Sequence, residues 1–213
     1  MLFFSPGLPL LLGAPNSDSK AFQMSSVIHE MRLASADIHH SFEQRLAITR
    51  TDAGPAEYLA FVCAMWGWLA PFERQLWSLD WPAELMQGSR DGKRRWLECD
   101  IRAGFGEGMV PEIARSPHMP KMDTLAERFG VAYVIEGAQM GSQVLRKTMG
   151  QALHPWPARW LAGYGDTVGN KWHVFRTSAE NHLRSQADIA LAAASARATF
   201  ESLDRWFQKT DIA

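Results

Sequence analysis

The sequence predicts an all-α protein, a single bundle of about seven or eight helices. Apolar residues recur every three to four positions along most of the 213-residue chain, which is the period of an amphipathic helix. No convincing stretch alternates apolar and polar residues with period two, and the content of β-branched residues is low. The sequence also has no internal repeat and no low-complexity segment, so one domain accounts for it.

The first half of the chain contains four expected helices, over residues 24–49, 56–70, 72–79 and 93–105. The first carries an apolar stripe through Val27, Met31 and Phe42. Gly54 and Pro55 mark the turn before the second, which is apolar nearly all round and is therefore expected to be central. Pro71 separates the second from the third, and glycines at positions 104, 106 and 108 close the fourth.

The second half contains the longest expected helix, residues 125–149. Thr124 can cap its first turn, and Gly150 follows its last residue. Residues 111–122, before this helix, are predicted to be a proline-punctuated loop with a short helix. A short tryptophan-rich helical turn is expected after it, followed by two more helices. These last three elements are placed at residues 155–162, 166–184 and 186–208.

Composition and charge exclude several classes of protein. The formal net charge of −1 gives no support for nucleic-acid binding or a polybasic membrane anchor. Cys63 and Cys99 lack CxxC spacing, so no zinc site or disulfide framework is expected and a reducing, cytoplasmic location is predicted. The apolar run over residues 1–15 lacks basic residues and is too short to span a bilayer. We expect residues 1–22 to be a poorly ordered extension, with a signal peptide as the alternative, and residues 23–210 to form the domain.

Two glycines interrupt the longest expected helix four residues apart. Gly137 and Gly141 share one helical face, although each costs about 1 kcal/mol relative to alanine. Tyr133, Met140 and Val144 fall on the same side, so this notch of bare backbone lies on an apolar face. Two interpretations are open: another helix packs closely here, or a flat ligand lies against the backbone.

His39 is the strongest candidate for a metal ligand among the seven histidines. It borders the apolar stripe of the first helix, whereas His40 is expected to face water. Glu43, one turn later, could accept the second ring N–H and leave the other nitrogen free for a metal. The alternatives are a structural histidine and an ordinary solvated carboxylate. No HExxH, paired ExxH, GxSxG or P-loop motif is present.

Residues 32–43, RLASADIHHSFE, resemble the proximal helix of haem oxygenases, whose approximate pattern is L-[RK]-x-A-T-x-x-x-H-x-x-x-E. Met31 stands in place of the leucine and Ser35 in place of the threonine, while His39 and Glu43 match. The family's distal helix has two glycines four apart and then a small residue, which the glycine notch followed by Ser142 resembles.

Three further segments carry the resemblance. YVIEG, at residues 133–137, is similar to bacterial members, including those that accompany phytochromes. WLECDIRAG, at residues 96–104, and the later pair Trp172 and Phe175 resemble two other family segments. Together the matched segments extend from about residue 26 to 206, in the family's order.

The resemblance implies a haem-oxygenase-like helical fold and the cleavage of haem by O2 and an external reductant to biliverdin, carbon monoxide and iron. It implies that His39 is the proximal iron ligand and that Gly137 and Gly141 form the distal wall. The residues that it assigns to haem contacts are Arg32, Glu43, Tyr133, Met140, Ser142, Val144, Lys171 and Arg176. Arg32, Lys171 and Arg176 would meet the haem propionates. The implied partners are a ferredoxin or flavoprotein reductase and a bacteriophytochrome that receives biliverdin.

One departure from the family keeps other functions open. In the animal enzymes an aspartate follows the first distal glycine and organises water, whereas Ala138 offers no polar group. Asp100 could supply one, with a structural helix–helix bond as its alternative role. A haem carrier or sensor without turnover is therefore a second hypothesis. A third is a thiaminase-like hydrolase, which would bind no haem and would use Cys63 or Cys99 as its nucleophile.

Overall fold

The computed structural model of the chain describes residues 26–106 and 108–210. The predicted extension at residues 1–22, and the domain boundary expected near residue 23, lie outside these ranges. The described residues form eight α-helices and include no β-strand, which confirms the predicted all-α class. The α-helices are α1 (Val27–Arg45), α2 (Pro55–Leu69), α3 (Glu73–Ser78), α4 (Lys93–Phe105), α5 (Leu125–Met149), α6 (Arg159–Ala162), α7 (Val168–His182) and α8 (Gln186–Lys209). Four short 3₁₀ helices cover Ala47–Thr49, Ala83–Leu85, Gln87–Ser89 and Gly165–Thr167.

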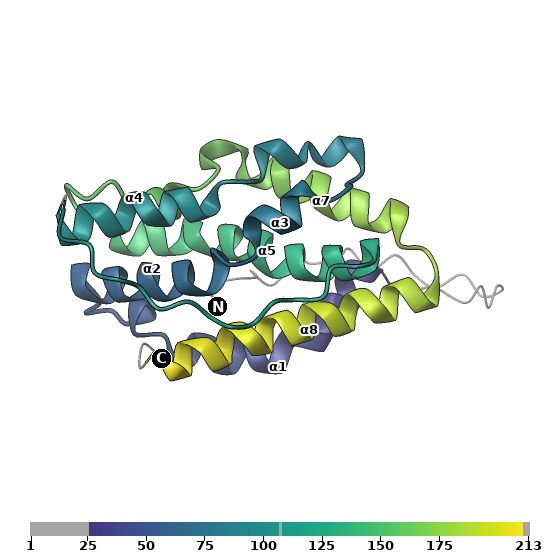
Figure 1. Cartoon of the computed structure of the whole chain (residues 1–213), viewed down its shortest axis with the longest axis horizontal. Helices are drawn as coiled ribbons and strands as arrows, with labels where there is room; N and C mark the ends of the chain where they lie inside the picture. Colours follow the sequence, from purple (N-terminus) through teal and green to yellow (C-terminus); the bar gives the residue numbers. More distant parts are fainter. Residues whose placement is uncertain (1–25, 107, 211–213) are drawn as a thin grey trace, which may run out of the picture.

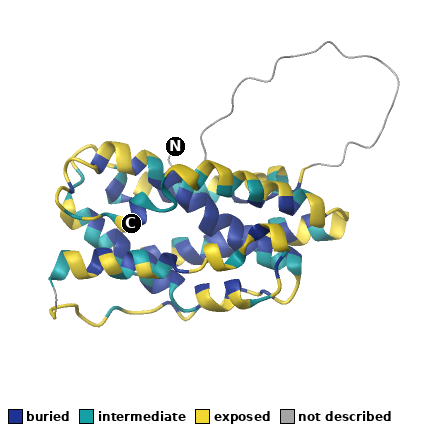
Figure 2. Cartoon of the chain, turned by 90° about the horizontal axis from the view of Figure 1, so that it is seen from above, coloured by how far each residue is buried: buried dark blue, intermediate teal, exposed yellow. Residues whose placement is uncertain are grey.

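Helix α5 is the centre of the bundle, and α8 joins it to α1. Figure 1 shows α8 along the lower side of the molecule with α1 behind it and α5 above. Helix α8 packs extensively against both α1 and α5, while α4 packs on α2 and α6 lies against α4 and α5. Figure 2 shows the buried residues on the inward faces of these helices. No helix in the described ranges is long and apolar enough to cross a membrane.

Helix α5 begins and ends where its local sequence signals predict. The Thr124 hydroxyl accepts a hydrogen bond from the backbone N–H of Glu127 (3.2 Å). The Glu127 carboxylate accepts one from the backbone N–H of Thr124 (2.9 Å), which completes a capping box. Nearly every residue from Phe129 to Ser142 is buried, so tertiary packing overcomes the weak propensity of the glycines.

Helix α1 is shorter than the apolar pattern predicted. It ends at Arg45 rather than near residue 49, because Leu46 adopts an extended backbone (φ −67°, ψ 116°). The chain then makes one 3₁₀ turn over Ala47–Thr49, in which Leu46 and Ile48 remain buried. Their burial explains why the apolar signal continued beyond the end of the helix.

The short helix predicted within residues 111–122 is not present. This segment is extended and crosses the molecule from the end of α4 to the start of α5 (Figure 1). The backbone N–H of Ser116 donates to the carbonyl of Gly67 in α2 (2.9 Å). Pro111, Pro117 and Pro120 have no N–H to donate within a helix, which explains why no helix forms.

Close approach of α5 and α8 occurs at Gly130, one of the glycines in the longest helix. A Cβ atom added there would lie 2.5 Å from the carbonyl oxygen of Ala192 and 2.6 Å from the Cβ of Ser195. The Ser195 hydroxyl also donates to the carbonyl of Glu127 across the same contact (2.9 Å). Helix–helix packing therefore accounts for Gly130.

We expect Gly130→Ala to lower the free energy of unfolding by roughly 1–3 kcal/mol, because overpacking outweighs the gain in helix propensity. Urea unfolding measures this change. Gly169→Ala is the matched control, because no atom lies within 4 Å of the added Cβ in α7, and it should not lower stability. Equal stability of the two variants would show that the α5–α8 contact adjusts without cost.

Candidate functional site

His39 lies at the edge of the core on α1. Its Nε2 atom is 3.8 Å from the Glu43 carboxylate, and its ring packs edge-on against Phe200 of α8 with centroids 5.3 Å apart. Burial lowers the pKa of His39, and the charge of Glu43 opposes this effect. Neutral imidazole, the form that binds a metal, is therefore favoured at neutral pH. His40 is exposed, with Nε2 3.0 Å from the side-chain nitrogen of Gln44.

The glycine notch lies in the buried middle of α5. Gly137 and Gly141 are both buried, and Tyr133, one turn before them, is fully buried. The Tyr133 ring packs against Trp172 of α7, with centroids 5.9 Å apart. Further along the same face Met140 is partly buried and Val144 is 41% exposed. The notch face thus passes from the core towards the surface as the helix advances.

Helices α1 and α5 face each other across a cavity of about 590 Å³. Residues at the C-terminal ends of both helices line it, together with the turn after α1. These are His40, Glu43, Gln44, Thr49, Arg50, Thr51, Ala53, Leu145, Thr148 and Met149. Its volume lies in the range that small-molecule sites occupy. In the described chain the two helices are joined mainly through α8 rather than by extensive contact of their own.

Two neighbour relations give the register of α1 against α5. Near the start of α1, the Arg32 guanidinium is close enough to Tyr133 to lower its pKa, although burial has the larger, opposite effect. Near the end, Glu43 lines the same cavity as Leu145. The two helices therefore advance in the same direction. A step of seven residues from Arg32 leads to His39, and the same step from Tyr133 leads to residue 140, within the notch.

The three basic residues predicted to meet propionates have different surroundings. Arg32 is exposed beside the α1–α5 gap, with a guanidinium nitrogen 3.3 Å from His29 Nδ1. Lys171, at the start of α7, contacts the Ser89 hydroxyl and lies 5.5 Å over the Tyr164 ring. Arg176 is exposed on the same helix. Arg32 and Lys171 are therefore both near α5, Arg32 beside Tyr133 and Lys171 beside Glu136.

Ser142 and Asp100, the two polar residues considered beside the notch, form bonds within the fold. The Ser142 hydroxyl donates to the carbonyl of Gln139, one turn earlier in α5 (2.8 Å). The Asp100 carboxylate accepts three hydrogen bonds, from the Tyr58 hydroxyl (2.6 Å) and the backbone N–H groups of Arg159 (2.7 Å) and Trp160 (2.8 Å). Asp100 therefore joins α4 to α2 and α6, the structural alternative considered for it, and does not replace the missing aspartate at Ala138.

Sequence reasoning missed a buried ionic cluster beside the notch. Glu136 Oε2 is 2.7 Å from Arg90 Nη1, and Glu136 Oε1 is 2.8 Å from Lys93 Nζ. The Tyr164 hydroxyl also donates to Glu136 Oε1 (3.0 Å). The one available signal was a glutamate inside the apolar stretch YVIEG, since Lys93 belongs to a KRR run that is typical of a solvated face.

The thiol groups give little support to a nucleophilic site. Burial raises the pKa of Cys63 to about 11, so its thiol stays protonated at neutral pH. Cys99 is exposed on α4. Among the described residues no group of three His, Cys, Asp or Glu side chains is arranged to hold a metal ion.

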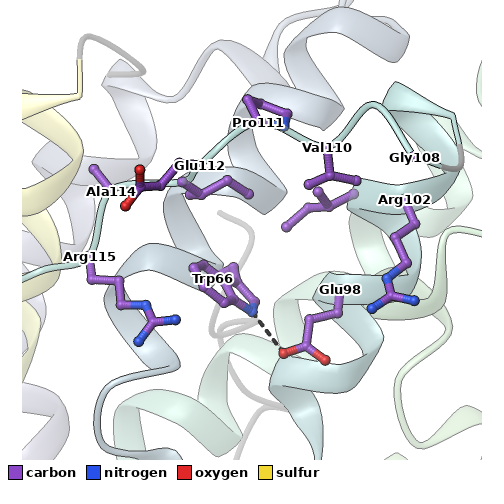
Figure 3. A pocket seen from close by; sticks show the side chains of 11 residues that line it. Trp66, Glu98, Arg102, Gly108, Val110, Pro111, Glu112, Ala114 and Arg115 are labelled. Carbon is purple, nitrogen blue, oxygen red and sulfur yellow. Dashed lines mark hydrogen bonds between the residues drawn. The ribbon is translucent and has the colours of Figure 1, made fainter.

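A separate cavity of about 1110 Å³ lies between α2, α4 and residues 108–115 (Figure 3). On its floor the Trp66 indole donates to the Glu98 carboxylate (3.1 Å), and the Arg115 guanidinium lies 5.1 Å over the Trp66 ring. No residue predicted for the site lines this cavity. It is therefore distinct from the gap between α1 and α5.

Comparisons with known proteins point to one family over most of the chain. A protein-family model described as "Heme oxygenase" matches residues 25–209, a range that contains both His39 and the glycine notch. A curated protein named "Heme oxygenase", from Xanthomonas campestris pv. campestris (strain 8004), is similar to the chain. The two are 34% identical over 136 residues, which cover 62% of this chain and 77% of that protein.

Proposed function

The chain belongs to the haem oxygenase family, and from that premise we propose that His39 and the glycine notch are the two walls of its haem site. Family membership supports haem as the substrate and iron as a released product. The observation that supports the proposal is the register of α1 and α5. Arg32 is near Tyr133, and Glu43 lines the same cavity as Leu145, so His39 would lie level with the notch. One wall offers a nitrogen ligand and the other offers bare backbone.

The residues present fit a haem group. A largely buried histidine whose burial favours the neutral form could hold the haem iron, and Glu43 is near enough to orient its ring. Arg32 stands beside Tyr133 at one end of the gap, where it can hold a propionate. Bound haem would supply the iron at which O2 and electrons react, and its own ring is the part that is cut.

The glycine notch would act on the opposite face of the substrate. Its backbone allows close approach and presents peptide dipoles without a side-chain acid. Met140, Ser142 and Val144 would complete this side. Since Ala138 has no polar group and the Ser142 hydroxyl is bonded to Gln139, the peptide groups themselves would hold water at the site.

The reaction that these features support is a monooxygenase-type oxidation of haem to biliverdin, carbon monoxide and iron. It requires O2 and external electrons, which a ferredoxin or a flavoprotein reductase would supply. Lys171 and Arg176 would hold propionates together with Arg32. A bacteriophytochrome is the proposed acceptor of biliverdin, on the similarity of the YVIEG segment to phytochrome-associated members of the family.

Haemin titration followed by turnover tests this function. We expect a one-to-one complex with a sharp Soret band, which decays under reductant and O2 while biliverdin absorbance rises. Haem that binds but stays intact would favour a carrier or sensor, the hypothesis that Ala138 motivates. Failure to bind haem would contradict the site itself and favour the hydrolase alternative.

A further inference from the structure

Glu136 immediately precedes the first glycine of the notch and is 2% exposed. Its two carboxylate oxygens meet three partners, Arg90, Lys93 and Tyr164, at 2.7–3.0 Å. None of these partners belongs to α5: Arg90 follows the 3₁₀ helix Gln87–Ser89, Lys93 is the first residue of α4, and Tyr164 follows α6. One side chain therefore fastens the middle of α5 to two other parts of the bundle.

The cluster is balanced in charge and closed to water. Arg90 and Lys93 are at most 1% exposed, and the second carboxylate, that of Glu73 in α3, is fully buried. Glu73 accepts hydrogen bonds from the backbone N–H groups of Lys93 (2.7 Å) and Arg94 (2.9 Å). Two cations thus face two carboxylates, of which only Glu136 is on α5. Removing one buried charge leaves its partner uncompensated, so the geometry of the cluster is strongly constrained.

The position of Glu136 on α5 matters for the direction in which the notch faces. Successive helical residues are about 100° apart, so Glu136 lies on the flank of the face that carries Gly137 and Gly141. An anchor on the flank resists rotation of the helix about its axis. The N-terminal half of α5 has a separate anchor on α8, at Gly130 and at the bond from Ser195 to Glu127. The Glu136 anchor is the nearer one to the notch.

The same cluster reaches the candidate propionate residue on α7. Arg90 Nη2 donates to the carbonyl oxygen of Lys171 (2.9 Å), and the Lys171 ammonium lies over the Tyr164 ring. Trp172, the next residue, packs against Tyr133. The buried charges of the Glu136 cluster therefore contact both α5, beside the glycine notch, and the start of α7.

We propose that Glu136 is a positioning residue, which, through Arg90, Lys93 and Tyr164, sets the rotation of α5 and the placement of α7 around the bound haem. This proposal rests on the proposed function. The rotation of α5 decides which part of the ring the bare backbone meets, and Lys171 bears on how the ring is turned in its plane. Glu136 thereby contributes to which bridge of the ring is opened, without touching the substrate.

Glu136→Gln tests this, because it keeps the shape of the side chain and removes the charge. Glu73→Gln is the matched control: it removes the other buried carboxylate of the same cluster, which contacts α4 and not α5. Both variants should be less stable than the wild type. Tyr164→Phe is a milder second variant that removes one bond to Glu136 and keeps the ring.

The first readout is hydrogen exchange of the protein without haem. In Glu136→Gln we expect faster exchange of the amides at residues 137–145, whereas Glu73→Gln should accelerate exchange at the start of α4 only. Tyr164→Phe should accelerate residues 137–145 less. This comparison does not depend on turnover, so it separates failure of the positioning role from failure of the proposed function. Unchanged exchange of residues 137–145 in Glu136→Gln would overturn the proposal.

The second readout is the biliverdin isomer that the haem-loaded protein releases, separated by chromatography. Glu136→Gln should lower kcat roughly 10- to 100-fold, as a displaced substrate does, and should produce a second isomer while the ferric Soret band is retained. Glu73→Gln should release the isomers in the wild-type ratio. A role in stability alone would not change that ratio. Wild-type isomers from a haem-loaded Glu136→Gln protein, or from Tyr164→Phe if Glu136→Gln does not fold, would refute the assignment.

Discussion

His39→Ala should remove the proposed protein ligand of the haem iron and reduce turnover by roughly a hundredfold or more. Loss of an outer partner of a metal ligand typically costs about 10- to 100-fold, and His39 is proposed as the ligand itself. The ferric absorption spectrum and the rate of Soret decay measure the two effects. Added imidazole should restore part of the wild-type spectrum, because the alanine leaves space beside Phe200 and Glu43.

His40→Ala is the matched control for this experiment. It removes the same side chain from the next position of α1, where the ring is exposed, lies beside Gln44 and borders the α1–α5 cavity. Its ferric spectrum should equal that of the wild type, because His40 is not the proposed ligand. A His39→Ala protein with the wild-type spectrum would mean that the iron has another ligand.

Gly141→Leu should nearly abolish turnover while the helix itself becomes more favourable. Leucine gains up to about 1 kcal/mol of helix propensity over glycine, but its side chain would project from the notch face into the gap. Displacement of a substrate by about 1 Å can cost 100-fold in rate. Single-turnover decay of the Soret band and the haem dissociation constant measure the effect.

The control is Gly169→Leu, the same substitution at a position in α7 where nothing lies within 4 Å of an added Cβ. It should turn over haem like the wild type. Normal turnover by Gly141→Leu would show that the notch serves helix packing alone, as Gly130 does against α8.

The sequence was a good guide wherever the governing forces are local. Helices α4 and α5 have the predicted bounds, because a capping box, flanking glycines and a strong apolar period act within a few residues. Residues 111–122 were predicted in part wrongly: the loop is present but the short helix is not. The prolines disfavour a helix there, and the N–H of Ser116 bonds instead to Gly67, a distant residue of α2. The end of α1 was misplaced for a similar reason, since Leu46 and Ile48 are buried after the helix has ended.

The candidate site shows the same division. The apolar stripe of the first helix predicted that His39 borders the core and that His40 is exposed, because both positions depend on the period of one helix alone. How α1 and α5 face each other depends on α8, which packs against both. The apolar pattern of each helix does not predict which other helices it contacts. The Glu136 cluster joins residues 46 and 43 positions apart along the chain, so neither partner revealed the other. The haem contacts of the remaining predicted residues stay predictions.

Helix α8 gives the two walls a common support. Arg197 donates to the carbonyl of Ala34 on α1 (2.7 Å), while Ser195, two residues earlier, donates to Glu127 on α5 (2.9 Å). The distance between α1 and α5 therefore depends on the packing of both helices against α8, and not on the length of a flexible loop. If α1 and α5 are the walls of the haem site, a molecule thicker than a flat ring would have to strain two packed interfaces at once. We therefore expect the bundle to favour a planar ligand before any bond to it forms.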